Sequence, residues 1–532
     1  MHQPANSPVR SHSSHCCPCG TSDRRARALA AYTALLGAGD ESEWLTTALT
    51  GLVWQSTTES QEPAAPPRRP LRVKPIFAYP QPQRAEMASW RNWGGIQSAG
   101  DVEAEQQRIG KELAELGTQA DFPLQFLPLA TIRRPAELQA HQADIQTADV
   151  LLYYGGGDGG GDLMSDVNYI DGLGKDVIFF VRHKSGPLYY WYEGAMARLL
   201  HQHTDTLATK SIRYEDVIVD NMREVLWRLR ALCGLANTRS SRIVAIGGPS
   251  GWGQPAGVVP DLARKRFGLE IQTVSYDELK KLIEAARKDA TAVAAAHSRA
   301  GSYLQLPGTT LETKPSYVEQ AFLLEHVFRQ ILTQADCRAL TINECMGTIM
   351  PMAETTACLT LSLLNDAGYQ AFCESDFVVI PAGMLLANIS DRPVFLNDPT
   401  YPHAGLITLA HCTAPRRMSG TSCDPVRIMT HFESDFGAAP KVEMPVGQLV
   451  TNILPDFAAE RWCGLTAQID SAPCMPICRS QIDIRYNCPD QLLAEHMPGF
   501  HWITGYGDFT RELGYAANKV GIRWHNLTPV QT

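Results

Sequence analysis

Two acidic residues, Glu374 and Asp398, follow apolar segments at positions where short strands would end. Glu374 comes directly after residues 371–373, and Asp398 comes after the strand-like segment 393–396. In open α/β sheets, ligands bind outside the carboxyl ends of the strands. Carboxylates there suit a hard divalent cation such as Mg²⁺ or Mn²⁺. His411 closes the next apolar run and could add an imidazole, so the pattern predicts a metal site.

The same acids also have a simpler interpretation as caps. Asp376 precedes residues 377–389, an apolar segment with small residues that predicts a buried helix, and Asp398 precedes Pro399. Aspartate often occupies such positions because its carboxylate accepts hydrogen bonds from nearby backbone N–H groups. Spacing alone leaves both interpretations open.

The acidic pattern resembles that of the L-fucose isomerase and L-arabinose isomerase superfamily of sugar ketol isomerases. The matching residues are Glu374-Ser375-Asp376, followed by Arg392 and Asp398. The resemblance implies that Glu374 and Asp398 both ligate a Mn²⁺ or Mg²⁺ ion and act on a sugar substrate. It also implies assembly into trimers or hexamers.

Two histidines extend this resemblance. His501 follows Pro498-Gly499 and enters a short apolar run, as does the C-terminal metal ligand of the family. His411 resembles a further ligand that the arabinose isomerase branch uses. The implied metal ligands are therefore Glu374, Asp398, His501 and His411.

Aldose–ketose exchange requires such a set of groups. A divalent ion that binds two neighbouring substrate oxygens acidifies the C–H bond and stabilises an enediolate. One carboxylate then takes the proton and returns it to the neighbouring carbon. Glu374 and Asp398 are the expected catalytic residues, and the sequence does not decide which of them is the base.

Further residues are expected substrate contacts. Glu344 ends the strand predicted at 339–343, and Asp376 belongs to the acidic motif itself. Trp252 lies in a glycine-rich turn, where the backbone can approach a ligand closely. His183 follows the strand predicted at 176–181 and precedes a group of aromatic side chains.

Two other functions compete with the isomerase interpretation. The loop 155–161 contains G-x-G-x-x-G after a predicted strand, which is a weak dinucleotide-binding signature. The first alternative is therefore an NAD-dependent sugar oxidoreductase. The second is a carbohydrate-binding relative that has no catalytic activity.

Composition limits the remaining classes. The chain has 532 residues, 44% hydrophobic and 19% charged, with a formal net charge of −9. This is globular composition with enough apolar residues for several domains. No clustered basic surface is expected, which argues against a nucleic-acid partner. No apolar run reaches the roughly 18 residues that a transmembrane helix needs.

Four segments are predicted. Residues 1–70 read as a disordered tail and proline-rich linker, in which Arg24-Arg25 before an apolar run resembles a degenerate twin-arginine export signal. We expect a cytoplasmic enzyme, with export to the periplasm as the alternative. Alternating strands and helices predict Rossmann-like parallel-sheet domains at 71–240 and 241–392. Short strands separated by turns predict a β-barrel at 393–532.

The 14 cysteines are scattered through the chain. Cys358 and Cys373 lie in apolar contexts typical of buried small hydrophobic residues. Cys474 and Cys478, with Cys463 and Cys488 nearby, suggest a weak zinc-site hypothesis. His431 is expected on the surface of a strand.

Overall fold

The protein is described by a computed structural model that covers residues 64–157, 163–194, 212–253 and 257–528. The chain divides into two compact units, Met1–Pro63 and Ala64–Thr532, and the second is described below. The predicted export signal lies outside the described residues. Residues 64–70 carry no helix or strand and lead into the first sheet.

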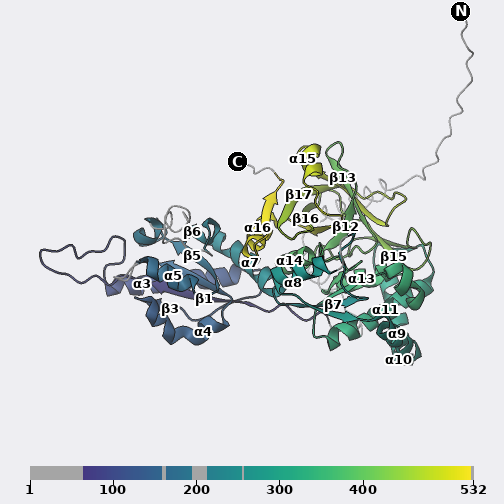
Figure 1. Ribbon diagram of the computed structural model, residues 1–532, viewed down its shortest axis with the longest axis horizontal. Helices are drawn as coiled ribbons and strands as arrows, with labels where there is room; N and C mark the ends of the chain where they lie inside the picture. Colours follow the sequence, from purple (N-terminus) through teal and green to yellow (C-terminus); the bar gives the residue numbers. More distant parts are fainter. Residues whose placement is uncertain (1–63, 158–162, 195–211, 254–256, 529–532) are drawn as a thin grey trace, which may run out of the picture. The chain divides into compact units, whose positions relative to one another are not determined.

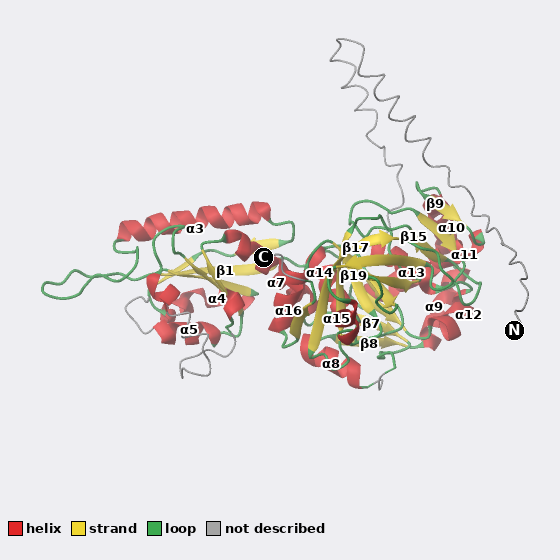
Figure 2. Cartoon of the chain, turned by 90° about the horizontal axis from the view of Figure 1, so that it is seen from above, coloured by secondary structure: helices red, strands yellow, loops and turns green. Residues whose placement is uncertain are grey.

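The first sheet is parallel, with the order β2-β1-β4-β5-β6 and with β3 paired to β1. Its central strands are buried along nearly their whole length, as expected for a parallel sheet covered on both faces. Figure 2 shows α3 on one side of this sheet and α4 and α5 on the other. The elements are β1 Leu71–Ala78, α3 Ala99–Gln119, β2 Leu124–Phe126, β3 Ala130–Ile132, η1 Pro135–His141, α4 Gln142–Thr147, β4 Val150–Gly155, α5 Leu163–Asp171, β5 Asp176–Val181, η2 Tyr214–Asp216, β6 Val217–Val219 and α7 Met222–Thr238.

The second parallel sheet has the order β11-β10-β7-β8. Every βαβ crossover here carries at least one helix, which is the connection that parallel strands require. The elements are β7 Arg242–Ile246, α8 Val258–Phe267, β8 Glu270–Val274, α9 Tyr276–Lys288, α10 Ala290–Leu304, α11 Pro315–Gln334, β10 Ala339–Ile342, the π-helical turn η3 Cys345–Ile349, α12 Met350–Ala353, α13 Ala357–Asp366, β11 Gln370–Phe372 and α14 Ile380–Ser390.

Helix α14 is apolar around its whole circumference and is buried from Ile380 to Ile389. It contacts β11 of the second sheet, β19 of the barrel and helix α7 (Figure 1). A helix without a polar face must be covered on all sides, and these neighbours supply the cover. The predicted buried helix is confirmed, but it begins three residues later than expected because residues 374–379 form a loop.

The C-terminal region contains a closed, six-stranded antiparallel β-barrel. Its order is β16-β19-β12-β13-β18-β17, and the pairing of β17 with β16 closes the ring. The elements are β12 Phe395–Pro399, β13 Leu406–His411, β16 Leu449–Pro455, β17 Arg461–Ser471, β18 Ser480–Tyr486, α15 Asp490–Glu495, β19 Trp502–Tyr506, α16 Thr510–Lys519 and β20 Arg523–Asn526, which pairs with β17 in parallel.

The strand expected around 426–431 lies outside this barrel. It forms β14 Val426–Met429 in a separate three-stranded sheet with β15 Ala439–Val442 and β9 Thr309–Leu311. The strand ends two residues before His431, which lies in the following turn and is buried, with 4% of its surface exposed. The expectation of a surface strand position for His431 is therefore wrong.

The glycine-rich loop after β4 has a packing explanation over its described part. A Cβ atom at Gly155 would overlap the ring of Tyr192, and one at Gly157 would overlap the ring of Pro80. Residues 158–161 of the proposed dinucleotide motif lie outside the described residues. The next strand, β5, is followed by the buried Arg182 in place of the acid that a dinucleotide fold uses.

Within the described ranges, no helix combines the length and hydrophobicity that crossing a bilayer requires.

Candidate metal centre

The predicted ligands come together where the loop after β11 reaches the barrel strands β19, β12 and β13. These three strands are consecutive neighbours in the barrel. Their register pairs Asn397 with Trp502 and Asp398 with Ala410, so Asp398 lies level with His501 on one side and close to His411 on the other. Three ligand candidates therefore come from adjacent strands.

Glu374 reaches the same place from the second parallel sheet. It follows β11, whereas Asp398 belongs to β12 of the barrel. The two acids therefore belong to different sheets. The reason is that β12 pairs with β13 and β19 and does not extend the sheet of β10 and β11. The two acids meet between two sheets.

The backbone around Glu374 has an unusual conformation. Glu374 and Ser375 have φ angles of 66° and 47°, which lie in the left-handed region. Non-glycine residues enter this region at a cost of about 1 kcal/mol or more each, and such strain gathers at functional sites. The turn is held in place by the N–H of Ser375, which donates to Thr341 Oγ1 at 3.1 Å, and by the N–H of Phe377, which donates to the carbonyl of Ser250.

Asp376 orients His501. Its Oδ2 lies 2.7 Å from His501 Nδ1, and its Oδ1 accepts the backbone N–H of Val378 at 3.0 Å. The interpretation of Asp376 as a helix cap is wrong, because Val379 is the N-cap residue of α14 and no side chain caps that helix, whereas Asp376 Oδ1 bonds a loop N–H. The side chains of Asp376 and His501 are almost fully buried. A carboxylate bonded to the far nitrogen of a histidine fixes the ring and its tautomer, as it does in many metal sites.

The other nitrogen of His501 faces the two predicted ligand carboxylates. Nε2 lies 3.1 Å from Asp398 Oδ1 and 3.5 Å from Glu374 Oε2. Neither His501 Nε2 nor Asp398 Oδ1 has a hydrogen-bond partner, although both atoms are buried. Buried polar atoms without partners are rare and call for an explanation such as an ion. The donor set of two carboxylates and an imidazole fits Mn²⁺ or Mg²⁺.

His411 completes the cluster. Its Nδ1 lies 2.9 Å from Thr413 Oγ1, and its side chain is buried. One ligand atom each from Asp398, His411 and His501 lie within 4.8 Å of one another, and so do those of Cys373, Glu374 and His411. His411 therefore belongs to both groups and links the two acids. Cys373 was predicted only as a buried hydrophobic residue.

The electrostatics reflect this crowding. Burial disfavours the charged imidazole of His501, but the carboxylates of Asp376, Asp398 and Glu374 raise its pKa to about 11. Burial would raise the pKa of Glu374, yet the adjacent His501 and His411 lower it. Burial lowers the pKa of His411 in spite of the acids near it. The site is thus a cluster of acidic groups that favours a cation.

An aromatic pair lies beside the cluster. The rings of Trp252 and Phe500 stack with centroids 3.7 Å apart and planes 7° from parallel, and each is roughly two-fifths exposed. The Trp252 ring centroid is 6.0 Å from that of His501, and its backbone N–H lies 3.3 Å from Asp376 Oδ1. Trp252 was predicted from its glycine-rich turn. Phe500 was missed, although its place next to His501 was a usable signal.

Two predicted substrate contacts have other partners. The carboxylate of Glu344 accepts a hydrogen bond from Thr348, and Glu344 belongs to none of the groups of described residues that could bind an ion. His183 is exposed on the loop after β5 and pairs with Glu193 at 2.9 Å. No contact of His183 with the cluster around His501 is found among the described residues.

Comparisons with known proteins return no relative: no family model matches the chain, and no curated protein matches it either. The interpretation of the cluster therefore depends on its own geometry and on the motif residues themselves.

Proposed function

We propose that the protein is a metal-dependent aldose–ketose isomerase of carbohydrate metabolism. The observation that carries the proposal is the convergence of Glu374, Asp398 and His501, with two buried polar atoms left without partners. The resemblance to the L-fucose and L-arabinose isomerases implies the same three residues as metal ligands.

Each side chain has a role in this proposal. Glu374, Asp398, His501 and His411 would hold Mn²⁺ or Mg²⁺, which when bound acts as a Lewis acid towards two neighbouring substrate oxygens. Glu374 and Asp398 are each about one-third exposed, so both carboxylates are accessible to a substrate. One of them takes a proton from carbon and returns it to the neighbouring carbon.

The substrate class follows from the surface next to these acids. The stacked rings of Trp252 and Phe500 offer an exposed apolar face near His501. Aromatic faces bind the C–H side of a sugar ring while polar groups address its hydroxyls. The same proposal includes a Rossmann-like character of the two parallel sheets. It also includes assembly into trimers or hexamers, which sedimentation analysis tests.

The decisive experiment assays a panel of aldoses for ketose formation with added Mn²⁺ and with EDTA. We expect turnover of at least one aldose with Mn²⁺ and none with EDTA. Sugar binding without ketose formation on any aldose, in protein saturated with Mn²⁺, would favour a non-catalytic carbohydrate-binding relative and overturn the proposal.

The variant Glu374→Gln tests the site itself. We expect a loss of activity of roughly 1,000-fold or more, since a neutral amide neither accepts the proton nor holds the ion. The matched control is Glu354→Gln, because Glu354 also has a positive φ of 55° but pairs with Arg287 on the surface. Full activity in Glu374→Gln would remove Glu374 from the mechanism.

A further inference from the structure

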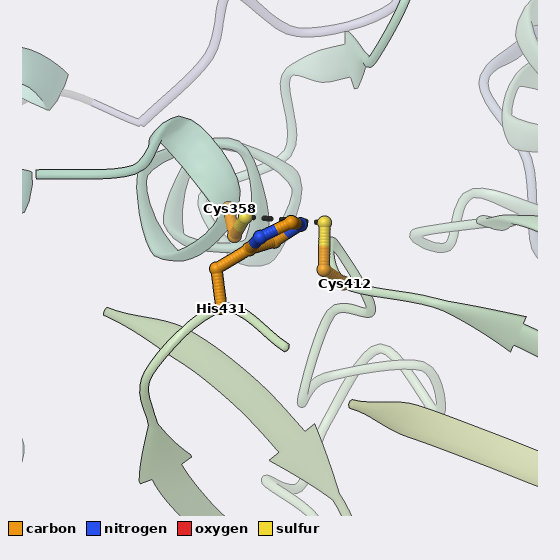
Figure 3. Close-up of side chains that lie close together, drawn as sticks. All are labelled: Cys358, Cys412 and His431. Carbon is orange, nitrogen blue, oxygen red and sulfur yellow. Dashed lines mark hydrogen bonds between the residues drawn. The ribbon is translucent and has the colours of Figure 1, made fainter. Parts of the chain in front are cut away.

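A second group of potential ligands, chemically different from the first, lies nearby. Cys358, Cys412 and His431 place one ligand atom each within 4.8 Å of the others. Figure 3 shows the imidazole of His431 pointing towards the two sulfur atoms. All three side chains are buried, with 4%, 5% and 4% of their surfaces exposed. These are sulfur and nitrogen donors in place of the oxygen donors around His501.

Three remote segments bring these side chains together. Cys358 lies in the first turn of α13, Cys412 directly follows β13, and His431 lies in the turn after β14. The α13 end is tied down by the N–H of Leu359, which donates to the carbonyl of Ala438 at 3.2 Å. The histidine turn is closed by its own backbone hydrogen bonds to residues 435 and 436. The cluster is therefore held by backbone structure on each side.

A third thiol, outside this group of three, lies close enough to Cys412 to affect its pKa. Cys478 is half-buried in the loop before β18, and it contributes, with Cys358 and burial, to the raised pKa of the Cys412 thiol. Its loop is fixed by Gln481, whose Nε2 donates to the carbonyl of Cys478 at 2.9 Å. With Cys478 the set is three cysteines and one histidine, which is a recurrent composition of structural zinc sites.

We infer that Cys358, Cys412, Cys478 and His431 form a tetrahedral Zn²⁺ site. Thiolate and imidazole ligands favour zinc over the hard cations that suit carboxylates. The sulfurs of Cys358 and Cys412 lie 3.1 Å apart. In a zinc tetrahedron with Zn–S bonds of about 2.3 Å they would lie roughly 3.8 Å apart, a small change that side-chain rotation supplies.

Burial of small apolar residues does not account for this arrangement. Cys463 illustrates the ordinary case, since it is fully buried in β17 and joins no group of ligands in the described part of the chain. A hydrophobic contact requires no histidine and no convergence of four segments. The sequence-based zinc hypothesis grouped Cys478 with Cys463, Cys474 and Cys488, and it is wrong because these four form no group of ligands in the described part of the chain.

The proposed zinc site adjoins the centre around His501 and differs from it. Cys412 directly follows His411, and Cys412 Sγ lies 4.0 Å from His411 Nδ1. A bound Zn²⁺ would fix the end of β13 and with it the position of His411. The zinc ion would have no open coordination position for a substrate, because four protein ligands occupy all the positions of a tetrahedral site.

The test uses the full chain, purified under reducing conditions, in which zinc is measured by mass spectrometry and then replaced by Co²⁺. We expect about one zinc ion per chain and, with Co²⁺, an intense near-ultraviolet sulfur-to-cobalt absorption with visible bands of tetrahedral geometry. Cys412→Ala and His431→Asn should bind the metal at least about tenfold more weakly. Cys463→Ala is the matched control and should keep the absorption.

Two results would overturn this inference. One is folded, reduced protein that shows no sulfur-to-cobalt absorption at saturating Co²⁺, and the other is a disulfide between Cys358 and Cys412 in the isolated protein. If Cys412→Ala does not fold, Cys478→Ala provides the readout, since its half-buried side chain is easier to replace. Glu374→Gln should keep the absorption, so that failure of this inference and failure of the isomerase proposal are separable.

Discussion

Two clusters of charged side chains in this protein have similar composition but differ in their hydrogen bonding. In the first sheet domain, the buried Arg182 donates to Glu105 and, through two nitrogens, to Glu112 at 2.9 and 2.7 Å. Tyr189 also donates to Glu105. Beside the barrel, by contrast, His501 Nε2 and Asp398 Oδ1 lie 3.1 Å apart with no hydrogen bond.

The difference indicates which cluster has a structural role. Around Arg182 each charge faces an opposite charge with directed hydrogen bonds, so the network needs nothing more. Around His501 three carboxylates face one imidazole, and two buried atoms within ion-pair distance of each other have no hydrogen-bond partner. A buried group without a partner destabilises the fold by about 1–3 kcal/mol, which a ligand that binds there would offset.

The largest expected effect on folding comes from Arg182→Met. This change removes the buried partner of Glu105, which keeps only Tyr189 and the part-exposed Arg108, and breaking a buried pair costs about 3–5 kcal/mol of unfolding free energy. Urea denaturation followed by circular dichroism measures it. The control Arg427→Met breaks an exposed pair with Glu312 and should cost less than about 1 kcal/mol. Equal losses of unfolding free energy in the two variants would show that the buried Arg182 network is no more important for stability than an exposed ion pair.

Asp398→Asn should affect metal binding strongly and folding stability little, in contrast to Arg182→Met. We expect the affinity for Mn²⁺ to fall about 100-fold, or roughly 2.7 kcal/mol, because a charged oxygen ligand is lost. The stability of the metal-free protein should fall by less than in Arg182→Met, since Glu374 and Asp376 still face the protonated His501 when the charge of Asp398 is removed. Calorimetric titration with Mn²⁺ tests this. Asp470→Asn, at a surface pair with Arg485 in the barrel, should bind Mn²⁺ normally.

The pH should change metal affinity in a defined direction. The pKa of His501 is raised to about 11, so its ring is protonated at neutral pH in the metal-free protein. A cation at Nε2 must displace that proton, and affinity should rise about tenfold per pH unit between pH 6 and 8. In the metal-free protein, the stabilisation from this group is complete below about pH 6.5 and is lost as pH rises towards 11. A flat affinity profile would exclude His501 as a ligand.

The smallest effect expected is that of Asp376→Asn. The amide oxygen can still accept the N–H of Val378, but the amide nitrogen cannot accept the proton of His501 Nδ1. Loss of such an orienting partner lowers metal affinity about tenfold or somewhat more. Mn²⁺ titration at several pH values measures it, and the pH dependence should change as well. An unchanged dependence of Mn²⁺ affinity on pH would mean that Asp376 does not orient His501 and only accepts the N–H of Val378.

Local sequence patterns were sufficient for the elements of this fold. Hydrophobic periodicity or composition within each segment predicts the parallel sheets, the buried helix near 377–389 and the barrel strands. The acids Glu374 and Asp398 were identifiable because each follows an apolar strand. The cap predicted at Asp376 is wrong, because α14 begins after Val379 and the Asp376 carboxylate instead bonds a loop N–H and His501.

Tertiary structure alone decided the partners. His501 meets Asp376 across 125 positions of sequence, and Cys358 meets Cys412 across 54. Such pairs depend on which strands are neighbours and in what register, and local periodicity carries no information on either. For the same reason the sequence grouped four cysteines that do not come together and put His431 on the surface. The residue types that can bind ions were visible in the chain, but the two ligand sets exist only because the barrel and the second sheet bring them together.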